Sequence, residues 1–313
     1  MATYILRRLV STIAVMAMVG IFVFLLVRLA PGDPAEFIAG DAATPQMVAG
    51  IREQLGLNEP LPVQFMHWSM KIIRGDFGTS ILTGRPVIQL ISQRLEPTIS
   101  LAILTMFVSV TIGVSFGILA AWRAGALVDR VLTAFSALGF SVPVFVVGFF
   151  LVYFFAMRMN WLPVQGYKLL GGGLGPWIVH LILPTIALSV AYVAFIARVT
   201  RASMLEVLSE DYMRTAAAKG ATPYAMLFHH ALKNAGVPIL TVIGISFAYL
   251  IGGVVLTETV FNIPGIGRLV VDAINTRDYP IIQSVLILTS GLYVLINLAI
   301  DLTYTLVDPR IRY

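Results

Sequence analysis

The chain has 313 residues, of which 58% are hydrophobic and only 12% charged, and its mean hydropathy is +0.89. A soluble globular domain carries about 25% charged residues, so this composition indicates an integral membrane protein. The net charge of +5 is spread along the chain and forms no basic run of the kind that binds nucleic acid. The absence of cysteine excludes disulfides, thiolate metal sites and cysteine nucleophiles.

Six apolar segments are long enough, or nearly long enough, to cross a bilayer, which takes about 20 residues per helix. They are residues 9–27, 99–121, 135–157, 181–197, 237–256 and 284–307. The first is too long for the core of a secretory signal, and residues 28–34 do not form a small-x-small cleavage site. We therefore predict an all-α membrane protein with about six transmembrane helices. Residues 1–30 form the cytoplasmic end and first helix, residues 31–98 an extracytoplasmic loop or cap, and residues 99–313 a five-helix core.

The distribution of Lys and Arg predicts the orientation of the helices. The short loops on one side hold only Arg158, Lys168, Arg268 and Arg277, and the long first loop does not count under this rule. The other side holds many more basic residues: Arg7, Arg8, Arg123, Arg130, Arg198, Arg201, Arg214, Lys219, Lys233, Arg310 and Arg312. We therefore expect both termini to be cytoplasmic.

The long first loop has its own helix signals. Thr44 is a predicted N-cap, with Pro45 at the first helical position and Gly56 after the last turn. Pro62 is expected to begin a second helix of about three turns. The loop is either a cap that shields the span ends or a docking surface for an extracytoplasmic partner.

The cytoplasmic loop 200–236 carries the clearest helix punctuation. Ser209 is a predicted N-cap, with Glu210 and Asp211 in the first turn, where the helix dipole favours negative charge. Lys219 then lies in the last turn and Gly220 just past the helix end.

A second short helix is predicted to follow, with Thr222 as its N-cap and Pro223 in its first turn. Helical spacing places one apolar stripe on it, formed by Tyr224, Leu227, Phe228 and Ala231. This stripe either packs against the protein's own spans or fits a groove on a partner.

Several segments resemble the permease subunits of bacterial ATP-binding-cassette importers, above all the dipeptide, oligopeptide and nickel branch. Residues 211–220, Asp-Tyr-Met-Arg-Thr-Ala-Ala-Ala-Lys-Gly, are similar to that branch's form of the cytoplasmic signature. The general signature differs, because Arg214-Thr215-Ala216 stands at its Glu-Ala-Ala position, His230 at its isoleucine and Lys233 at its proline. Further similar segments follow in the same order along the chain, at residues 4–8, 30–34, 52–57, 75–80, 258–267, 277–280 and 307–310.

The resemblance implies a type I importer permease with a long first extracytoplasmic loop, the first of two paired permease types. Its implied partners are a second homologous permease, two cytoplasmic ATPases that bind ATP and Mg, an extracytoplasmic substrate-binding protein and membrane lipid. Its implied location is the bacterial cytoplasmic (inner) membrane. The implied coupling segment comprises Arg214, Thr215, Ala216, Gly220, Ala221, Thr222, Pro223, Tyr224, Leu227 and Phe228.

The implied cargo is a di- or oligopeptide, moved by alternating access; nickel and glutathione importers share the same motifs. An ion-coupled secondary transporter is the alternative from another class. Residues that could line or gate a pathway are Pro143, which frees backbone carbonyls, the polar Thr241, Ser246 and Tyr249, and Glu258. Glu258 could meet a peptide's amino group or be an ordinary carboxylate at a span end.

The sequence contains no Gly-x-x-x-x-Gly-Lys-Ser/Thr segment, so we expect this chain to hold no ATP through a P-loop and to have no catalytic residues. The histidines lack metal-ligand spacing, so no metal site is predicted. Gly113-x-x-x-Gly117 is predicted to allow two helices to approach closely. Asp301, within the sixth span, fits a structural ion pair better than a proton relay.

Overall fold

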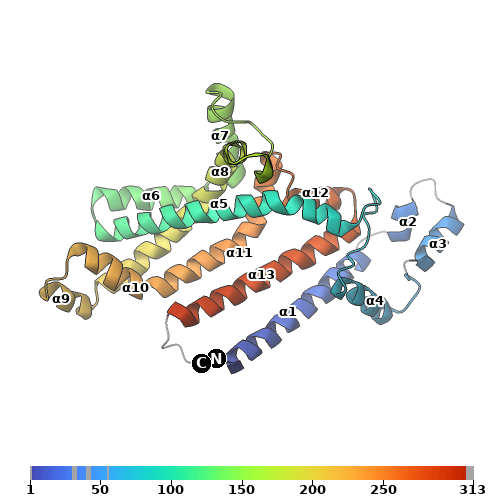
Figure 1. Cartoon of the computed structure of the whole chain (residues 1–313), viewed down its shortest axis with the longest axis horizontal. Coiled ribbons are helices and arrows are strands. Elements are labelled where there is room, and N and C mark those ends of the chain that lie inside the picture. The colour runs from blue at the N-terminus through green and yellow to red at the C-terminus, as the bar shows by residue number, and fades with distance from the viewer. Residues whose placement is uncertain (1, 30–33, 40–43, 55, 308–313) are drawn as a thin grey trace. The chain divides into compact units, whose positions relative to one another are not determined.

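The computed structural model describes residues 2–29, 34–39, 44–54 and 56–307, and this part of the chain is almost entirely helical (Figure 1). The motif residues 30–33 and 308–310, and the basic residues Arg310 and Arg312, lie outside the described residues. Five described helices are long and apolar enough to cross a membrane, and a bent pair brings the number up to six. The five are α1 (Ala2–Leu29), α5 (Val87–Trp122), α8 (Leu174–Leu208), α11 (Gly236–Val260) and α13 (Tyr279–Val307). The predicted all-helical architecture with about six spans is confirmed.

The predicted third span is not a single helix. It is divided between α6 (Leu127–Ser141) and α7 (Val144–Leu151), and α7 continues into the π-helical segment η1 (Val152–Arg158). The two parts meet at an angle of 102°. Pro143 has no backbone N–H to donate and forces the preceding Val142 into an extended conformation, with φ −87° and ψ 124°. The prediction of a continuous span over residues 135–157 is therefore wrong, because the apolar composition continues across a break in the backbone.

The chain divides into two compact units. Unit 1 contains residues 1–93 and 269–294, and unit 2 contains residues 94–268 and 295–313. The three-part division expected from the sequence stays a prediction. Unit 1 adds three short helices to α1: α2 (Pro34–Ala39), α3 (Pro45–Gln54) and α4 (Leu61–Ile73). Most of α12 (Ile266–Asn275) and the first half of α13 complete it.

The helix starts in unit 1 agree closely with the sequence. The N–H of Met47 donates to the Thr44 hydroxyl at 3.4 Å, and α3 begins at Pro45, so the predicted N-cap is confirmed. Helix α4 begins at Leu61, one residue before the expected Pro62. Proline fits either of the first two positions because their N–H groups have no partner within the helix.

Hydrogen bonds between distant segments hold unit 1 together. Asp278 is 1% exposed and accepts a hydrogen bond of 2.5 Å from the Ser80 hydroxyl and one of 3.3 Å from the Leu82 N–H. The side chain of Gln283 donates to the carbonyl of Val23 in α1 at 3.2 Å. Buried polar groups are stabilising only when they are paired in this way, so the segments 75–80 and 277–280 act as one structural element.

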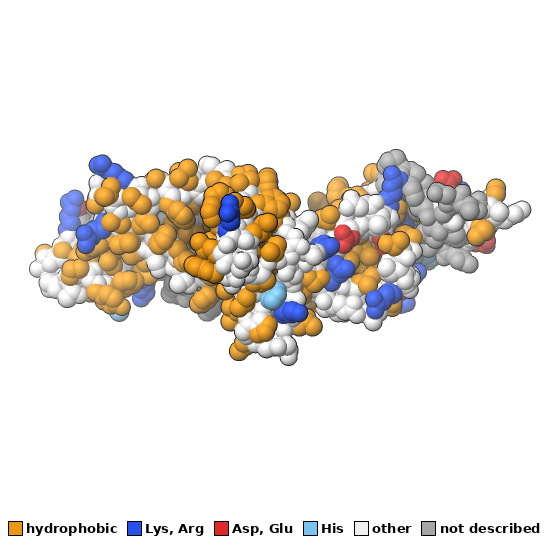
Figure 2. Space-filling model, turned by 90° about the horizontal axis from the view of Figure 1, so that it is seen from above, with side chains coloured by type: hydrophobic (Ala, Val, Ile, Leu, Met, Phe, Trp, Pro, Cys, Tyr) orange, Lys and Arg blue, Asp and Glu red, His pale blue; other side chains and the backbone are white. Residues whose placement is uncertain are grey.

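Helix α8 is the central helix of unit 2. At four glycines a Cβ atom would lie within 3.3 Å of an atom of α8: Gly113 and Gly117 on α5, Gly139 on α6 and Gly253 on α11. Small residues at these positions let the helix backbones approach closely, which is how helices associate in a bilayer. Apolar side chains cover the middle of unit 2, whereas Lys and Arg gather at the end that carries α9 (Asp211–Ala218) (Figure 2).

Candidate functional site

The segment between α8 and α11 forms a helical projection at one end of unit 2 (Figure 1). Its first helix, α9, begins at Asp211 with Glu210 as the N-cap residue. The predicted cap at Ser209 is wrong, because α8 continues to Leu208 and the Ser209 hydroxyl donates back to the Glu206 carbonyl at 2.7 Å. A hydroxyl bound to the preceding turn is not available to cap the next helix.

The residues at the Glu-Ala-Ala position of the signature lie along α9. Arg214 is exposed and reaches the Asp211 carboxylate at 3.4 Å, and the Thr215 hydroxyl donates to the Asp211 carbonyl at 3.2 Å. The carbonyl of Ala216 accepts the N–H of Ala221 at 3.1 Å, which closes the end of the helix. These contacts are local and leave the outer face of α9 open to solvent or to a partner.

Gly220 ends α9 as the sequence predicts. Its φ is +84°, and no atom lies within 4 Å of the position that a Cβ would occupy. Glycine is therefore required by backbone conformation and not by lack of space. The Thr222 hydroxyl then accepts the N–H of Ala225 at 3.3 Å, which confirms the second N-cap, with Pro223 in the first turn.

The second helix is largely π-helical, in η3 (Ala225–Ala231), before α10 (Leu232–Asn234) leads into α11. This wider turn divides the predicted apolar stripe. Tyr224 is 71% and Phe228 42% exposed, and their ring centroids are 4.7 Å apart. Leu227 and Ala231 instead pack inward, and Ala231 is fully buried. The reading that the stripe packs on the protein is correct for Leu227 and Ala231, whereas the fit of Tyr224 and Phe228 to a partner's groove stays a prediction.

An apolar cluster fixes the projection to the helix ends of unit 2. Met213 of α9 and Ala231 of η3 are buried against Met204 of α8, Ile118 of α5 and Ile239 of α11. Asn234 adds a hydrogen bond of 3.0 Å to the hydroxyl of Tyr212. The projection is therefore packed directly on the ends of three long helices.

The predicted pathway residues do not form one site. Pro143 is exposed at the bend between α6 and α7. Thr241 is half-buried and donates to the carbonyl of Val237 in its own helix at 2.8 Å. Ser246 is fully buried, and its hydroxyl has no hydrogen-bond partner among the described residues. Tyr249 is 70% exposed, so its side chain is accessible on the surface of α11.

Glu258 is fully buried and held by hydrogen bonds. Its carboxylate accepts the Thr98 hydroxyl at 2.5 Å and the N–H of Arg268 at 3.0 Å. The Thr98 hydroxyl in turn accepts the N–H of Ile266 at 2.8 Å. A Cβ at Gly265 would overlap the carboxylate. We call this group (Thr98, Glu258, Ile266 and Arg268, with Gly265 and Gly267) the Glu258 knot; it fastens the segment after α11 to α5.

A second buried carboxylate, which the sequence did not single out, joins α6 to α8. Asp129 is 4% exposed and forms two hydrogen bonds with Arg201, 2.5 Å from Nε to Oδ1 and 2.8 Å from Nη2 to Oδ2. The N–H of Gly125 at 2.9 Å and the hydroxyl of Thr133 at 3.3 Å also donate to it. The available signal was an acidic residue at the start of an apolar segment and an arginine at the end of another, but nothing in the sequence pairs them.

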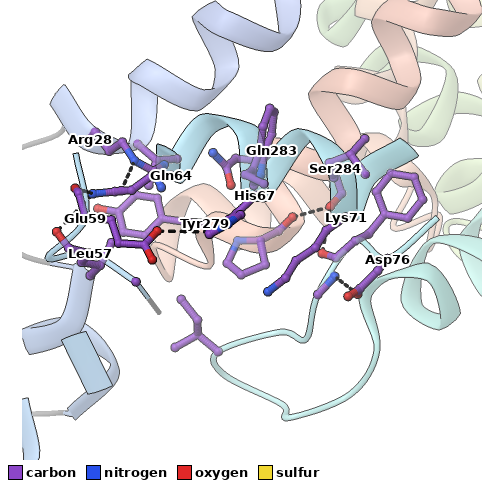
Figure 3. Close-up of a pocket in the computed structure, with 18 of the residues that line it drawn as sticks. Arg28, Leu57, Glu59, Gln64, His67, Lys71, Asp76, Tyr279, Gln283 and Ser284 are labelled. Carbon is purple, nitrogen blue, oxygen red and sulfur yellow. Dashed lines mark hydrogen bonds and ion pairs between the residues drawn. The ribbon is translucent and has the colours of Figure 1, made fainter. Parts of the chain in front are cut away.

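Unit 1 contains a pocket of about 440 Å³ between α4, the following loop and the start of α13 (Figure 3). Aromatic side chains line part of it, namely Trp68, Phe77 and Tyr279. At one end Arg28 donates to the buried Gln64 at 3.0 Å. Charged residues of both signs surround the pocket, namely Arg28, Glu53, Glu59, Lys71 and Asp76, and His67 also lines it.

Among the described residues, no group of three or more His, Asp or Glu side chains is placed to hold a metal ion. His67 lies 3.1 Å from Glu59, where both side chains are exposed.

Two family descriptions together cover nearly the whole chain. "Binding-protein-dependent transport system inner membrane component" matches residues 113–313, and its N-terminal companion matches residues 1–102. Over the full length of both proteins, the chain is 76% identical to the "Probable peptide ABC transporter permease protein y4tP" of Sinorhizobium fredii. It is 44% identical, again over both full lengths, to the "Glutathione transport system permease protein GsiC" of Salmonella choleraesuis.

A solved structure shares the fold. A chain of the MetNI methionine ABC transporter, in an inward-facing conformation, matches with a TM-score of 0.58 at 20% identity, covering 71% of this chain and 97% of that one. The fold prediction is confirmed, as is the assignment of ATP hydrolysis to partner ATPases. The chain belongs to the inner-membrane permease subunits of binding-protein-dependent ATP-binding-cassette transporters.

Proposed function

We propose that this chain is the first of two homologous permeases in an importer of short peptides, working by alternating access. Two cytoplasmic ATPases drive it, and an extracytoplasmic binding protein delivers the peptide. The peptide assignment is supported by the 76% identity over the whole chain to a probable peptide permease. The ion-coupled alternative has no support, because the family depends on ATPases.

The exposed pair of Tyr224 and Phe228 is the observation that carries the coupling assignment. Exposed aromatic rings on a short, rigidly mounted helix are typical anchors for a groove on a partner. The buried cluster beneath them supplies the rigid mounting. We assign contact with an ATPase to Arg214, Thr215, Ala216, Gly220, Ala221, Thr222, Pro223, Tyr224 and Phe228, whereas Leu227 packs beneath them.

The proposed orientation places the projection and both termini in the cytoplasm. The basic end of unit 2 around α9 (Figure 2) supports this, because Lys and Arg favour the cytoplasmic side. Helix α1 runs from the N-terminal end of the chain to Arg28, which lines the pocket of unit 1 (Figure 3), so a cytoplasmic N-terminus places this pocket on the outer side, and we assign it to the binding protein as a docking cleft. Its aromatic lining and mixed charges suit a protein loop.

The coupling assignment is tested with Tyr224→Glu in the purified complex. A charge in place of the ring cannot enter an apolar groove without a large desolvation cost, so we expect the ATPases to be lost on purification and ATP-driven uptake to fall at least about tenfold, the equivalent of roughly 1.4 kcal/mol. His229→Glu is the matched control, because it adds the same charge at an exposed position on the same helix. Retention of ATPases and uptake by Tyr224→Glu would show that the pair does not meet the ATPase.

Glutathione is the second candidate cargo, favoured by the 44% identical permeases. Both cargoes are short peptides, and competition separates them. Uptake of labelled dialanine by the reconstituted importer should be blocked by unlabelled dipeptide at concentrations where glutathione has little effect. The reverse order of potency would assign the importer to glutathione.

A further inference from the structure

The ion pair between Asp129 and Arg201 joins two helices at the end of unit 2 that carries the projection. Both carboxylate oxygens of Asp129 bond to the guanidinium, at 2.5 and 2.8 Å, in the bidentate geometry that fixes orientation as well as distance. With Gly125 and Thr133 also donating, the carboxylate has four donors. It has no spare acceptor for a ligand, and it is held as a charged group by its partners.

The position of Arg201 connects this pair with the coupling projection. Three residues further along α8 lies Met204, which is fully buried in the cluster that holds Met213 and Ala231 of the projection. Residues three apart lie on neighbouring turns of the same helix. The ion pair therefore lies about one helical turn from Met204, the residue of α8 that packs against the projection.

Helix α6 carries the other partner and leads to the bend. It contacts α8 at two levels: near its start through Asp129, and near its end at Gly139, where a Cβ would lie 3.3 Å from the Cβ of Ala194. Beyond this contact the chain turns by 102° at Pro143 into α7. A helix attached at both ends follows its neighbour as one body, whereas a helix attached at one end can pivot.

We propose that Asp129 and Arg201 are positioning residues that make α6 move with α8, so that a displacement of the projection is passed to the bent α6–α7 segment. The inference rests on the proposed function, since it presumes that the projection is driven by an ATPase. It assigns the pair a role in coupling that is separate from holding unit 2 together. Lysine cannot replace the arginine, because an ammonium group lacks the planar pair of donors.

The test compares Arg201→Lys with Arg198→Lys in the full importer, reconstituted in liposomes with its binding protein. Arg198 lies three residues earlier on α8 and touches α6 through the ring of Phe140, 5.4 Å from its centroid, so it is a matched control at a weaker contact. The measurement is peptide uptake per ATP hydrolysed. We expect Arg201→Lys to lower this ratio at least about fivefold while ATP hydrolysis stays within about twofold, and Arg198→Lys to leave the ratio unchanged.

Two other outcomes would overturn the proposal. If Arg201→Lys leaves the ratio unchanged, the pair does not transmit movement. If uptake and hydrolysis fall together, in proportion to the amount of intact complex, the pair is only a stabilising contact. Failure of the proposed function is recognised separately, because the unchanged importer would then show no ATP-driven peptide uptake.

Discussion

The two loops that flank α11 both depend on glycine, but for opposite reasons. At the Glu258 knot the glycines are required by space, because a Cβ at Gly265 would overlap the Glu258 carboxylate and a Cβ at Gly267 would lie 2.6 Å from the Cα of Val255. At the coupling projection, Gly220 has empty space around it and is required by its φ of +84°. The first loop is locked against the body of unit 2, whereas the second exposes an aromatic pair. Glycines required by close packing therefore mark a loop that is fixed to the protein, whereas a glycine required only by its φ marks a loop whose surface is available to a partner.

The largest effect is expected from Gly265→Ala. The added methyl group cannot be accommodated without breaking the hydrogen bonds of Glu258, so we expect a loss of about 3 kcal/mol or more in stability. Thermal unfolding of the purified complex, with the yield of inserted protein, measures it. Gly252→Ala is the control on α11: no atom lies within 4 Å of its Cβ position, and alanine is favoured in a helix by up to about 1 kcal/mol. Equal melting temperatures for the two variants would contradict the knot.

Glu258→Ala comes next and tests whether the carboxylate is a fastening or a pathway group. Removing the acceptor deprives the Arg268 N–H and the Thr98 hydroxyl of their carboxylate partner inside the protein, at a cost of about 2 kcal/mol. Glu258→Gln keeps an acceptor oxygen, so we expect it to melt between Glu258→Ala and the unchanged protein. A glutamine variant of full stability that takes up peptides with a changed preference for a free amino terminus would assign Glu258 to the pathway.

The smallest effect on stability is expected at Gly220. Gly220→Val places a branched residue at positive φ, which costs about 1–2 kcal/mol, whereas Gly220→Asn is tolerated because asparagine adopts this conformation more readily. The valine variant should lose ATP-driven uptake while remaining inserted, because the strain distorts the projection. Equal uptake by the two variants would mean that the turn does not have to keep its shape.

The sequence predicted features that depend on neighbouring residues and missed those that depend on distant ones. The spans, the caps at Thr44 and Thr222 and the turn at Gly220 follow from composition and local spacing, and the structure has them. The Glu258 knot joins residues 160 positions apart, and no local pattern indicates that Thr98 is its partner.

The same reasoning explains the errors. The bend at Pro143 lies within a continuous apolar segment, and hydropathy alone does not detect a break in the helix there. Ser209 has the right identity for an N-cap but was already bound to the preceding turn. The predicted stripe assumed 3.6 residues per turn, but η3 is π-helical and its wider turn separates the side chains of the stripe. The sequence does not reveal this change of helix type.

The Glu258 knot also limits how this protein can change over evolutionary time. The Glu258 carboxylate needs the Thr98 hydroxyl as a hydrogen-bond donor, and it occupies the space that a side chain at position 265 would fill. A substitution that removes the carboxylate or the hydroxyl leaves a hydrogen-bonding group without its partner, and a side chain added at position 265 collides with the carboxylate, so such a change is tolerated better when a second substitution accompanies it. Among related permeases these positions should therefore vary as a set, and lineages that have lost one should have lost the others.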